Sequence, residues 1–296
     1  MTQVTWGRMR TFLAVVEHHS IRDAAAALHV TESAVSAAIS HMEKSLSAEL
    51  FVRDGRGIRL TESGRIYAGY CRTIVAMVEQ ASEAVRSAGH GRLRIGAVAT
   101  ASESVLPTLL ASFRDRHPEI ELTLTVLPRD DLFDAQTHHE TDLVIAGRPP
   151  PDSNLTTRAM RANRLIVVGA PDSFDHALAA TWLLRGPGSG TRDTALGLLA
   201  QLDAAPPTLT LGTHGAVVAA AREGLGVTLV HADAVEDDLS RGLLATFPLR
   251  HTPLDRPWHV VTTDLLTGSA SLFLAHITDS ALVGSSAFHL LKPPVG

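Results

Sequence analysis

Cysteine is almost absent from this chain of 296 residues, which contains only Cys71. One cysteine excludes an internal disulfide framework and a cysteine-rich zinc site, and it is typical of a reducing compartment. Long apolar runs are missing too, because the one near the N-terminus, Phe12–Val16, ends at Glu17. That run is too short for a signal peptide, and no stretch approaches the roughly 18–20 apolar residues that span a bilayer. We therefore expect a cytoplasmic protein with no membrane partner.

Enzyme motifs are also missing. The string Gly186–Gly190 reads GPGSG, which lacks the lysine of a nucleotide P-loop and does not match the G-x-S-x-G of hydrolases. Gly224-x-Gly226 indicates a helix-to-strand turn rather than a dinucleotide fingerprint. The best metal cluster, His138–Glu140, has no further ligand at helical spacing. No catalytic triad can be assigned, so we expect no enzyme, no metal site and no cofactor.

The net charge of −5 argues against nucleic-acid binding over the whole surface, but it allows a small DNA-binding module on an acidic body. The useful signal is local. Arg53, Arg56 and Arg59 lie within seven residues of one another, and only Asp54 opposes them. A basic surface is therefore expected near residue 56.

The first 60 residues predict a helix-turn-helix followed by a two-stranded wing. Apolar spacing indicates helices over 6–19, 21–28 and 32–46, with Ser20 and Thr31 as N-caps of the second and third. In the third helix a buried stripe is expected, and the opposite face carries small and polar residues, as insertion into a major groove about 12 Å wide requires. The stripe comprises Val35, Ile39, Met42 and Leu46. Residues 49–60 have apolar ends around two glycines, which predicts a β-hairpin.

A long helix is expected over residues 61–88. Its apolar residues follow a nearly heptad spacing, so a second subunit is expected to cover them. They are Ile66, Tyr70, Ile74, Met77, Ala81 and Ala84. Cys71 beside them is expected to be a half-buried small residue rather than a redox switch, and Gly89–Gly91 is expected to form a hinge.

From Arg92 onward, strands alternate with helices, which predicts two α/β lobes. A ligand cleft is expected between them, where carboxyl ends of strands and amino ends of helices converge. The fold class is therefore α+β and α/β, with a DNA-binding domain at 1–61, a linker helix and hinge at 62–91 and a two-lobed domain at 92–296. The first lobe is expected at 92–162 and 264–296, and the second at 163–263.

With these residues in view, the chain resembles the LysR-type transcriptional regulators. The pattern matches in order and spacing over about fifty residues, and the resemblance extends to the linker helix and to an effector domain like a periplasmic binding protein. The matching residues are Phe12, Val15, Ser20, Ala24, Ala25, Leu28, Ala34, Val35, Ser36, Ile39, Glu43, Leu50, Phe51, Val52, Arg53, Leu60, Thr61 and Gly64. Two residues depart from it: Met42, often leucine, is a packing swap, and Glu32 stands where glutamine is usual.

The resemblance, with the small and polar face of the third helix, implies the DNA contacts. They are expected from Thr31, Glu32, Ser33, Ser36, Ala37 and Ser40 of that helix, and from Arg53 and Arg56 of the wing. Two interpretations of Glu32 stay open. It either favours the helix dipole or changes the preferred operator, since a carboxylate can accept from cytosine N4. Arg53 is either a DNA contact or part of an internal ion pair.

Effector residues are expected where helix N-termini face the cleft, because their free N–H groups attract anions. The string Gly188–Arg192, GSGTR, resembles the corresponding loop in the branch of the family that controls carbon-fixation and sulfur genes. A small anionic metabolite is therefore expected. An N-cap without a ligand is the alternative for each position. The candidates are Thr100, Ala101, Ser102, Arg148, Ser189, Gly190, Thr191, Arg192, Thr213 and His214.

As a whole the resemblance implies a dimer of dimers on an interrupted palindrome in a promoter, with RNA polymerase as a possible partner. Ligand closure of the cleft would then change the DNA bend. The runner-up is a plain ligand-binding protein of the solute-receptor type with a vestigial N-terminus.

Overall fold

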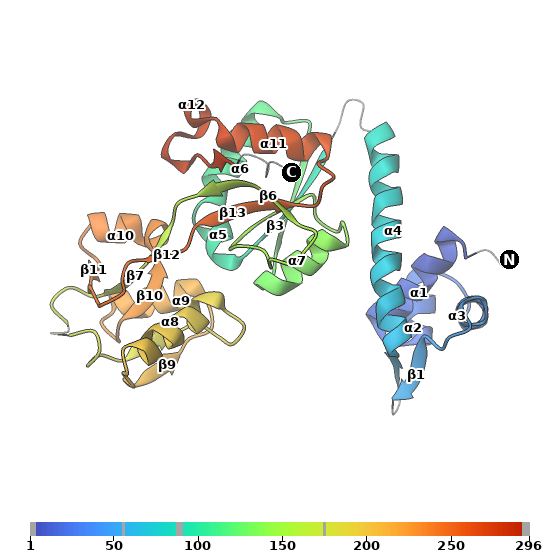
Figure 1. Ribbon diagram of the computed structural model, residues 1–296, viewed down its shortest axis with the longest axis horizontal. Coiled ribbons are helices and arrows are strands. Elements are labelled where there is room, and N and C mark those ends of the chain that lie inside the picture. Colours follow the sequence, from blue (N-terminus) through green and yellow to red (C-terminus); the bar gives the residue numbers. More distant parts are fainter. Residues whose placement is uncertain (1–3, 55–56, 87–90, 174–175, 292–296) are drawn as a thin grey trace. The chain divides into compact units, whose positions relative to one another are not determined.

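The computed structural model describes residues 4–54, 57–86, 91–173 and 176–291, and the chain divides into two compact units, residues 1–89 and most of the remainder (Figure 1). None of the helices in those ranges is long and apolar enough to cross a membrane. The first unit holds a three-helix bundle, a wing and a long helix, as the sequence predicted. Its elements are α1 (Trp6–His18), α2 (Ile21–Leu28), α3 (Glu32–Leu46), β1 (Phe51–Asp54), β2 (Gly57–Leu60) and α4 (Glu62–Arg86).

An aromatic cluster forms the centre of this unit. The ring of fully buried Phe12 lies 5.3 Å, centroid to centroid, from the rings of both Phe51 and Tyr67. These residues come from α1, the wing and α4 respectively, so the three parts share one core.

The wing is held to the helices by backbone contacts. Oε1 of Glu43 accepts a hydrogen bond from the N–H of Leu50 at 2.9 Å. Thr61 caps α4: its hydroxyl donates to the carbonyl of Glu49 at 2.6 Å and accepts from the N–H of Gly64 at 2.9 Å. A Cβ atom on Gly64 would lie 2.0 Å from the carbonyl oxygen of Leu50, so glycine is required for this approach.

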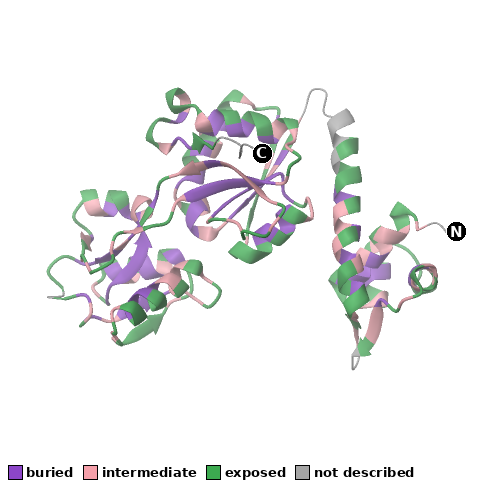
Figure 2. Ribbon diagram, viewed as in Figure 1, coloured by how far each residue is buried: buried purple, intermediate pink, exposed green. Residues whose placement is uncertain are grey.

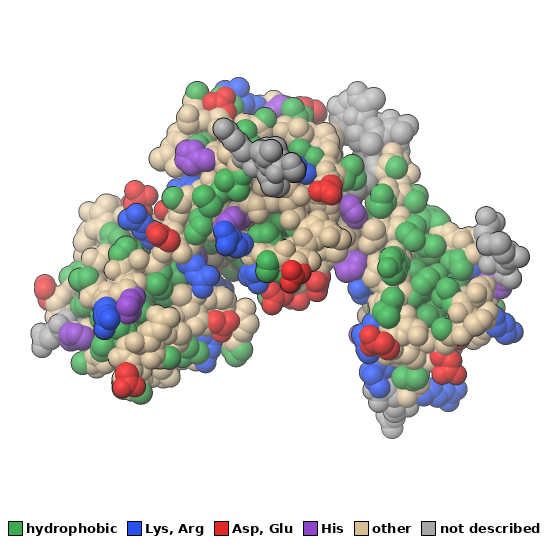
Figure 3. All heavy atoms as spheres, in the orientation of Figure 1, with side chains coloured by type: hydrophobic (Ala, Val, Ile, Leu, Met, Phe, Trp, Pro, Cys, Tyr) green, Lys and Arg blue, Asp and Glu red, His purple; other side chains and the backbone are tan. Residues whose placement is uncertain are grey.

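Helix α4 has an apolar face that is exposed in the described part of the chain, and Figure 3 shows hydrophobic side chains gathered along it. Tyr70 is 66% exposed and Ile66 57% exposed, with Ile74 and Met77 also exposed. The predicted stripe is therefore accessible in the single chain, although the side chain of Ala84 lies outside the described residues. Cys71 is fully buried rather than half-buried, and burial raises the pKa of its thiol to about 11.

The first lobe of the second unit contains a six-stranded sheet of order β14-β6-β13-β5-β3-β4, whose interior is buried (Figure 2). β3 runs parallel to β4 and β5, while β13 is antiparallel to β5 and β6. Phe113 and Phe273 pack edge to face beneath the sheet. The elements are β3 (Arg92–Ala97), α5 (Ala99–Glu103), α6 (Leu106–Arg116), β4 (Glu121–Val126), α7 (Arg129–Thr137), β5 (Leu143–Ala146), β6 (Thr156–Arg161), β13 (Trp258–Thr262), α11 (Gly268–Thr278), α12 (Ser280–Val283), η2 (Gly284–Ser286) and β14 (His289–Leu290).

The second lobe is built around antiparallel β7 and β10 and the parallel pair β8 and β9. A parallel bridge between Trp182 and Val227 joins the two parts, and Trp182 is fully buried. The elements are β7 (Arg164–Gly169), β8 (Trp182–Leu184), α8 (Gly190–Gln201), β9 (Thr208–Thr210), α9 (His214–Arg222), β10 (Thr228–His231), η1 (Ala232–Val235), α10 (Glu236–Ser240), β11 (Ala245–Thr246) and β12 (Leu254–Asp255).

Three expectations need correction. The second lobe does not extend to residue 263, because β13 pairs with β5 and β6 in the first lobe's sheet. The expected alternation of strands and helices does not hold after β3, where two helices follow one another, α5 and α6, with Pro107 in the first turn of α6. Leu46 is not part of the buried stripe of α3, since it is the last helical residue and is 39% exposed.

Candidate functional site

The outer face of α3 is accessible along its length. All six candidates on this helix and its cap are exposed, whereas Val35, Ile39 and Met42 on the other side are buried. The six are Thr31, Glu32, Ser33, Ser36, Ala37 and Ser40. The helix is thus anchored by one face and presents short side chains on the other.

Side-chain caps fix the start of α3. Oγ1 of Thr31 accepts from the N–H of Ala34 at 3.2 Å and lies 3.0 Å from Oγ of Ser33. Ser20 caps α2 in the same way through the N–H of Asp23. His29, between the two helices, has a φ of 56°, the left-handed value that closes the turn. The two hydroxyls at the start of α3 are therefore already oriented by the helix itself.

The wing has two described arginines, Arg53 on β1 and Arg59 on β2, and both are exposed. Arg53 is exposed on β1, directly opposite Ile58 of β2. Arg56, the other candidate, lies outside the described residues.

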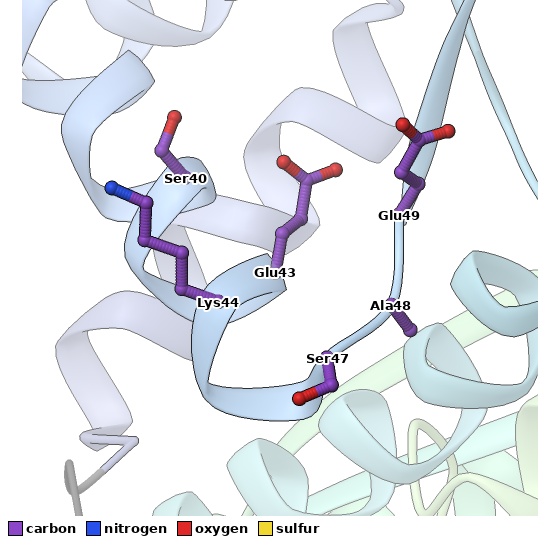
Figure 4. A pocket seen from close by; sticks show the side chains of 6 residues that line it. All are labelled: Ser40, Glu43, Lys44, Ser47, Ala48 and Glu49. Atoms are coloured by element: carbon purple, nitrogen blue, oxygen red, sulfur yellow. The ribbon is translucent and has the colours of Figure 1, made fainter.

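A groove of about 340 Å³ lies at the carboxyl end of α3, lined by residues from Ser40 to Glu49 (Figure 4). Lys44 is its only basic lining residue, and the carboxylates of Glu43 and Glu49 oppose it. The mixed charge makes this groove a poor phosphate site. Glu43 also has a structural task, because its carboxylate holds the start of the wing.

In the first lobe, the candidates lie where two parallel strands end. β3 leads to Thr100 and β5 to Arg148, so both follow carboxyl ends on the same edge of the sheet. Thr100 is buried and does not cap α5, because the N-cap position is Val98. The amides of Ala101 and Ser102 both donate to the carbonyl of Val98, so they are not the free anion donors that we expected.

Arg148 is exposed, and its carbonyl accepts from Nη2 of Arg129 at 2.6 Å. Burial lowers the pKa of His259, and the guanidinium of Arg148 adds to this shift. The charge of Arg148 therefore acts on β13, the strand that returns from the second lobe.

In the second lobe, the two predicted helix N-termini are adjacent. The N–H of Gly186, after β8, donates to the carbonyl of Gly212, after β9, at 3.0 Å. Helix α8 begins at Gly190, followed by half-buried Thr191, and Ser189 is its N-cap without a side-chain capping bond. Thr213 caps α9 by accepting from the N–H of Ala216.

Arg192 and His214 were both expected as effector contacts, but their surroundings differ. Nη1 of Arg192 donates to the carbonyl of Arg185 at 2.9 Å and to Oγ1 of Thr210 at 3.1 Å, so this guanidinium links α8 to the residue after β8 and to the last residue of β9. His214 is buried, and burial together with Arg185 lowers the pKa of its imidazole to about 4.

The sequence interpretation missed Arg185 and His231, which lie at the same edge as His214. Arg185 follows β8 and His231 ends β10, and the charge of Arg185 acts on the His231 imidazole. Nδ2 of Asn163 lies 2.7 Å from Nδ1 of His231, and the ring of Trp258 lies 4.4 Å from the His231 ring. The signal for Arg185 was its place directly before GPGSG, and recognising Trp182–Leu184 as a strand would have revealed it.

Within the described ranges no group of three or more His, Cys, Asp or Glu residues is arranged to hold a metal ion.

Both units of the chain match models of one protein family. The model described as "Bacterial regulatory helix-turn-helix protein, lysR family" matches residues 6–65, and "LysR substrate binding domain" matches residues 86–281. The chain is 32% identical to the HTH-type transcriptional regulator CbbR of Rhodospirillum rubrum over 265 residues, which cover 86% of this chain and 88% of that protein.

Solved structures give the same picture of the fold. ArgP from Mycobacterium tuberculosis aligns with a TM-score of 0.74 at 20% identity, covering 96% of this chain and 98% of that one. The Synechocystis PCC6803 CcmR regulatory domain, in complex with 2-PG, aligns with a TM-score of 0.56 at 25% identity, covering 63% of this chain and 95% of that one.

Proposed function

Because this chain belongs to the LysR family of transcriptional regulators, we propose that α3 reads its operator, that the protein assembles as a dimer of dimers, and that a small anionic metabolite controls it. It is a DNA-binding transcriptional regulator with an effector-binding domain. The runner-up, a solute receptor with a vestigial N-terminus, is disfavoured because the helix-turn-helix model matches residues 6–65 and the caps of α2 and α3 are intact.

The observation that carries the DNA-binding part of the proposal is the exposed face of α3 opposite its buried stripe. Short side chains at Ser33, Ser36, Ala37 and Ser40 let the helix backbone come close to base edges, and Arg53 on the wing reaches phosphates. Glu32 at the start of the helix is exposed, and both of its interpretations remain to be tested.

A gel-shift titration with the intergenic DNA beside the protein's own gene tests this part. We expect retardation that weakens steeply as salt rises, because phosphate contacts release counterions. Ser36→Glu should abolish specific binding by placing a carboxylate against the DNA, while Asp152→Asn, an exposed position between β5 and β6, serves as the surface control. Equal binding by wild type and Ser36→Glu would refute a role for this face.

Operator selection with Glu32→Gln separates the two interpretations of Glu32. A changed base preference at one position supports base readout. An unchanged preference, with a small loss of stability, supports a role in the helix dipole.

Three exposed surfaces support the proposed assembly. The apolar face of α4 has the spacing of a coiled-coil seam, which favours pairing of two linker helices. In the first lobe, β4 is the terminal strand of its sheet, and Leu124 and Val126 on it are exposed beside a groove of about 370 Å³ against α6. In the second lobe, β9 is exposed throughout. Open strand edges of this kind favour contacts between effector domains.

The effector part rests on the cationic edge of the second lobe and on similarity to CcmR, whose regulatory domain was solved with 2-PG. Calorimetry of the full chain against a panel of carboxylates and phosphate esters, including 2-PG, tests it. Binding that survives Thr100→Ala and Thr191→Ala together would refute the proposed location. Contact with RNA polymerase belongs to the same proposal and is tested by transcription from the operator in vitro.

A further inference from the structure

One edge of the second lobe gathers basic groups from three strands. β8 and β9 are parallel, and Trp182 of β8 also forms a parallel bridge with Val227, the residue directly before β10. Their carboxyl ends therefore lie on one side, where Arg185 follows β8, Thr213 and His214 follow β9, and His231 ends β10. The amino-terminal turns of α8 and α9 begin at this same edge.

Three polar atoms at this edge are buried without a hydrogen-bond partner in the described parts of the chain. They are Nε of Arg185, Nδ1 of His214 and Oγ of Ser189. His214 is only 5% exposed. A buried donor without a partner destabilises a fold, and native proteins keep few of them without a reason. A ligand that accepts hydrogen bonds would satisfy Nε of Arg185 and Oγ of Ser189, and also Nδ1 of His214 once that atom is protonated.

The charges facing His214 are predominantly positive. Arg185 acts on both His214 and His231, and Arg256, which donates to Thr194 at 2.6 Å, acts on His231. The exposed carboxylate of Glu103 on α5 is the acidic group that acts on Arg185. Asp193 lies in the first turn of α8, and Asp233 is paired with Arg161. The edge therefore has more cationic than anionic groups.

The two histidines differ in what they can offer. An amide nitrogen only donates, so Nδ1 of His231 must accept from Asn163 and the ring is neutral. Burial, then His214, Arg256 and Arg185, lower the pKa of His231 to about 3. His214 has no such partner on Nδ1, and this atom becomes a donor when it is protonated.

We propose that Arg185 and His214 hold the anionic group of the effector, that this group is a dianion such as a phosphate ester or sulfate, and that His214 takes up one proton from solvent as the dianion binds. The inference rests on the effector role proposed above. The proton adds to Nδ1 of His214, which then donates to a ligand oxygen, and the dianion compensates the charge of Arg185. Arg192 is not assigned as an anion contact, because its Nη1 already donates to the carbonyl of Arg185 and to Oγ1 of Thr210.

Sulfate is a suitable probe, because it remains a dianion across the pH range in which histidine titrates. Intrinsic tryptophan fluorescence of the full chain reports its binding, since Trp258 stacks on His231. Titrations at pH 5.5, 6.5, 7.5 and 8.5 give the apparent affinity. Uptake of one proton predicts that affinity falls with rising pH, by up to about tenfold per pH unit between the pKa of His214 in the free protein, about 4, and its higher pKa in the complex, and that it levels off above the latter.

Two variants locate the effect. Arg185→Gln should weaken sulfate binding about tenfold or more at every pH, because a charge-assisted hydrogen bond is lost. His214→Gln should bind with an affinity that no longer depends on pH. Arg241→Gln, an exposed arginine of the same lobe that pairs with Asp237, is the matched control and should behave as wild type.

The proposal is overturned if sulfate does not bind, if its affinity does not depend on pH, or if Arg185→Gln and His214→Gln bind it as wild type does. Gel shifts with the same proteins separate this result from the proposed function. Retained DNA binding with lost anion response in the two variants supports the inference. Failure of the wild type to bind any promoter DNA contradicts the regulatory role, and the sulfate titrations then decide the anion site by themselves.

Discussion

The carboxylate of Glu43, in the last turn of α3, accepts a hydrogen bond from the backbone N–H of Leu50, just before the wing. The same oxygen lies 3.4 Å from the N–H of Phe51. One side chain thus fixes the start of the wing relative to α3.

Glu43→Ala should lower the free energy of unfolding of the DNA-binding unit by about 1–3 kcal/mol, because two backbone N–H groups lose a charged acceptor. Thermal or denaturant unfolding measures this change. DNA affinity should fall with it, since the wing loses its anchor. Glu49→Ala removes a nearby carboxylate and should leave both quantities unchanged, and equal effects of the two substitutions would contradict the anchoring role.

Gly64→Ala should lower the free energy of unfolding by at least about 2 kcal/mol, because its methyl group would overlap the carbonyl of Leu50. Gly7→Ala is the matched control in α1, where a Cβ meets nothing within 4 Å. That substitution should be neutral or stabilise by up to about 1 kcal/mol, as alanine does within helices. Similar denaturation midpoints for the two variants would show that the wing can move away from α4.

Ile74→Glu should separate the protomers, because it places a carboxylate in the apolar face of α4 that we propose as the pairing seam. Light scattering after size exclusion should show a smaller assembly of 31.5 kDa chains, and DNA binding should weaken as paired half-sites are lost. Glu79→Lys, also exposed on α4, should leave the mass unchanged. An unchanged assembly in Ile74→Glu would place the pairing surface elsewhere.

Stability should fall as the pH rises from about 9 toward 11. Burial raises the pKa of the Cys71 thiol to about 11 and that of the Tyr67 hydroxyl as well, so the folded state binds more protons than the unfolded state in this window. The stabilisation is complete below about pH 9 and is lost as the pH rises through the pKa that Cys71 has in the folded state. Unfolding at graded pH measures this, and Cys71→Ala should flatten the profile. Cys71 should also resist alkylation at neutral pH until the protein unfolds.

The DNA-binding unit was predictable because its signals are local. Caps at Ser20 and Thr31, the spacing of Val35, Ile39 and Met42, and the glycines of the hairpin each specify structure within a few residues. Only Leu46 was wrong in the buried stripe, because burial at the end of a helix depends on what packs there.

The two-lobed unit was predictable in class but not in detail. β6 was missed because its sequence, Thr156–Arg161, is polar, and it is a strand only because β13 and β14 pair with it. β13 was assigned to the wrong lobe for a related reason: sequence order does not reveal which sheet a strand joins. The candidate effector residues were taken from helix starts, which include His214 but not Arg185, because Arg185 follows a strand, β8, rather than beginning a helix.

The bond from Arg192 to the carbonyl of Arg185 has a consequence for genetics. A screen for regulators that no longer respond to their inducer should return substitutions at both arginines, since one supports the other. The two classes of mutant should differ in whether a second mutation restores the response. Mutations that stabilise the second lobe elsewhere should restore the response of Arg192 mutants, whereas Arg185 mutants should stay unresponsive. Arg192, which would resemble a ligand contact in such a screen, would then prove to have a structural role.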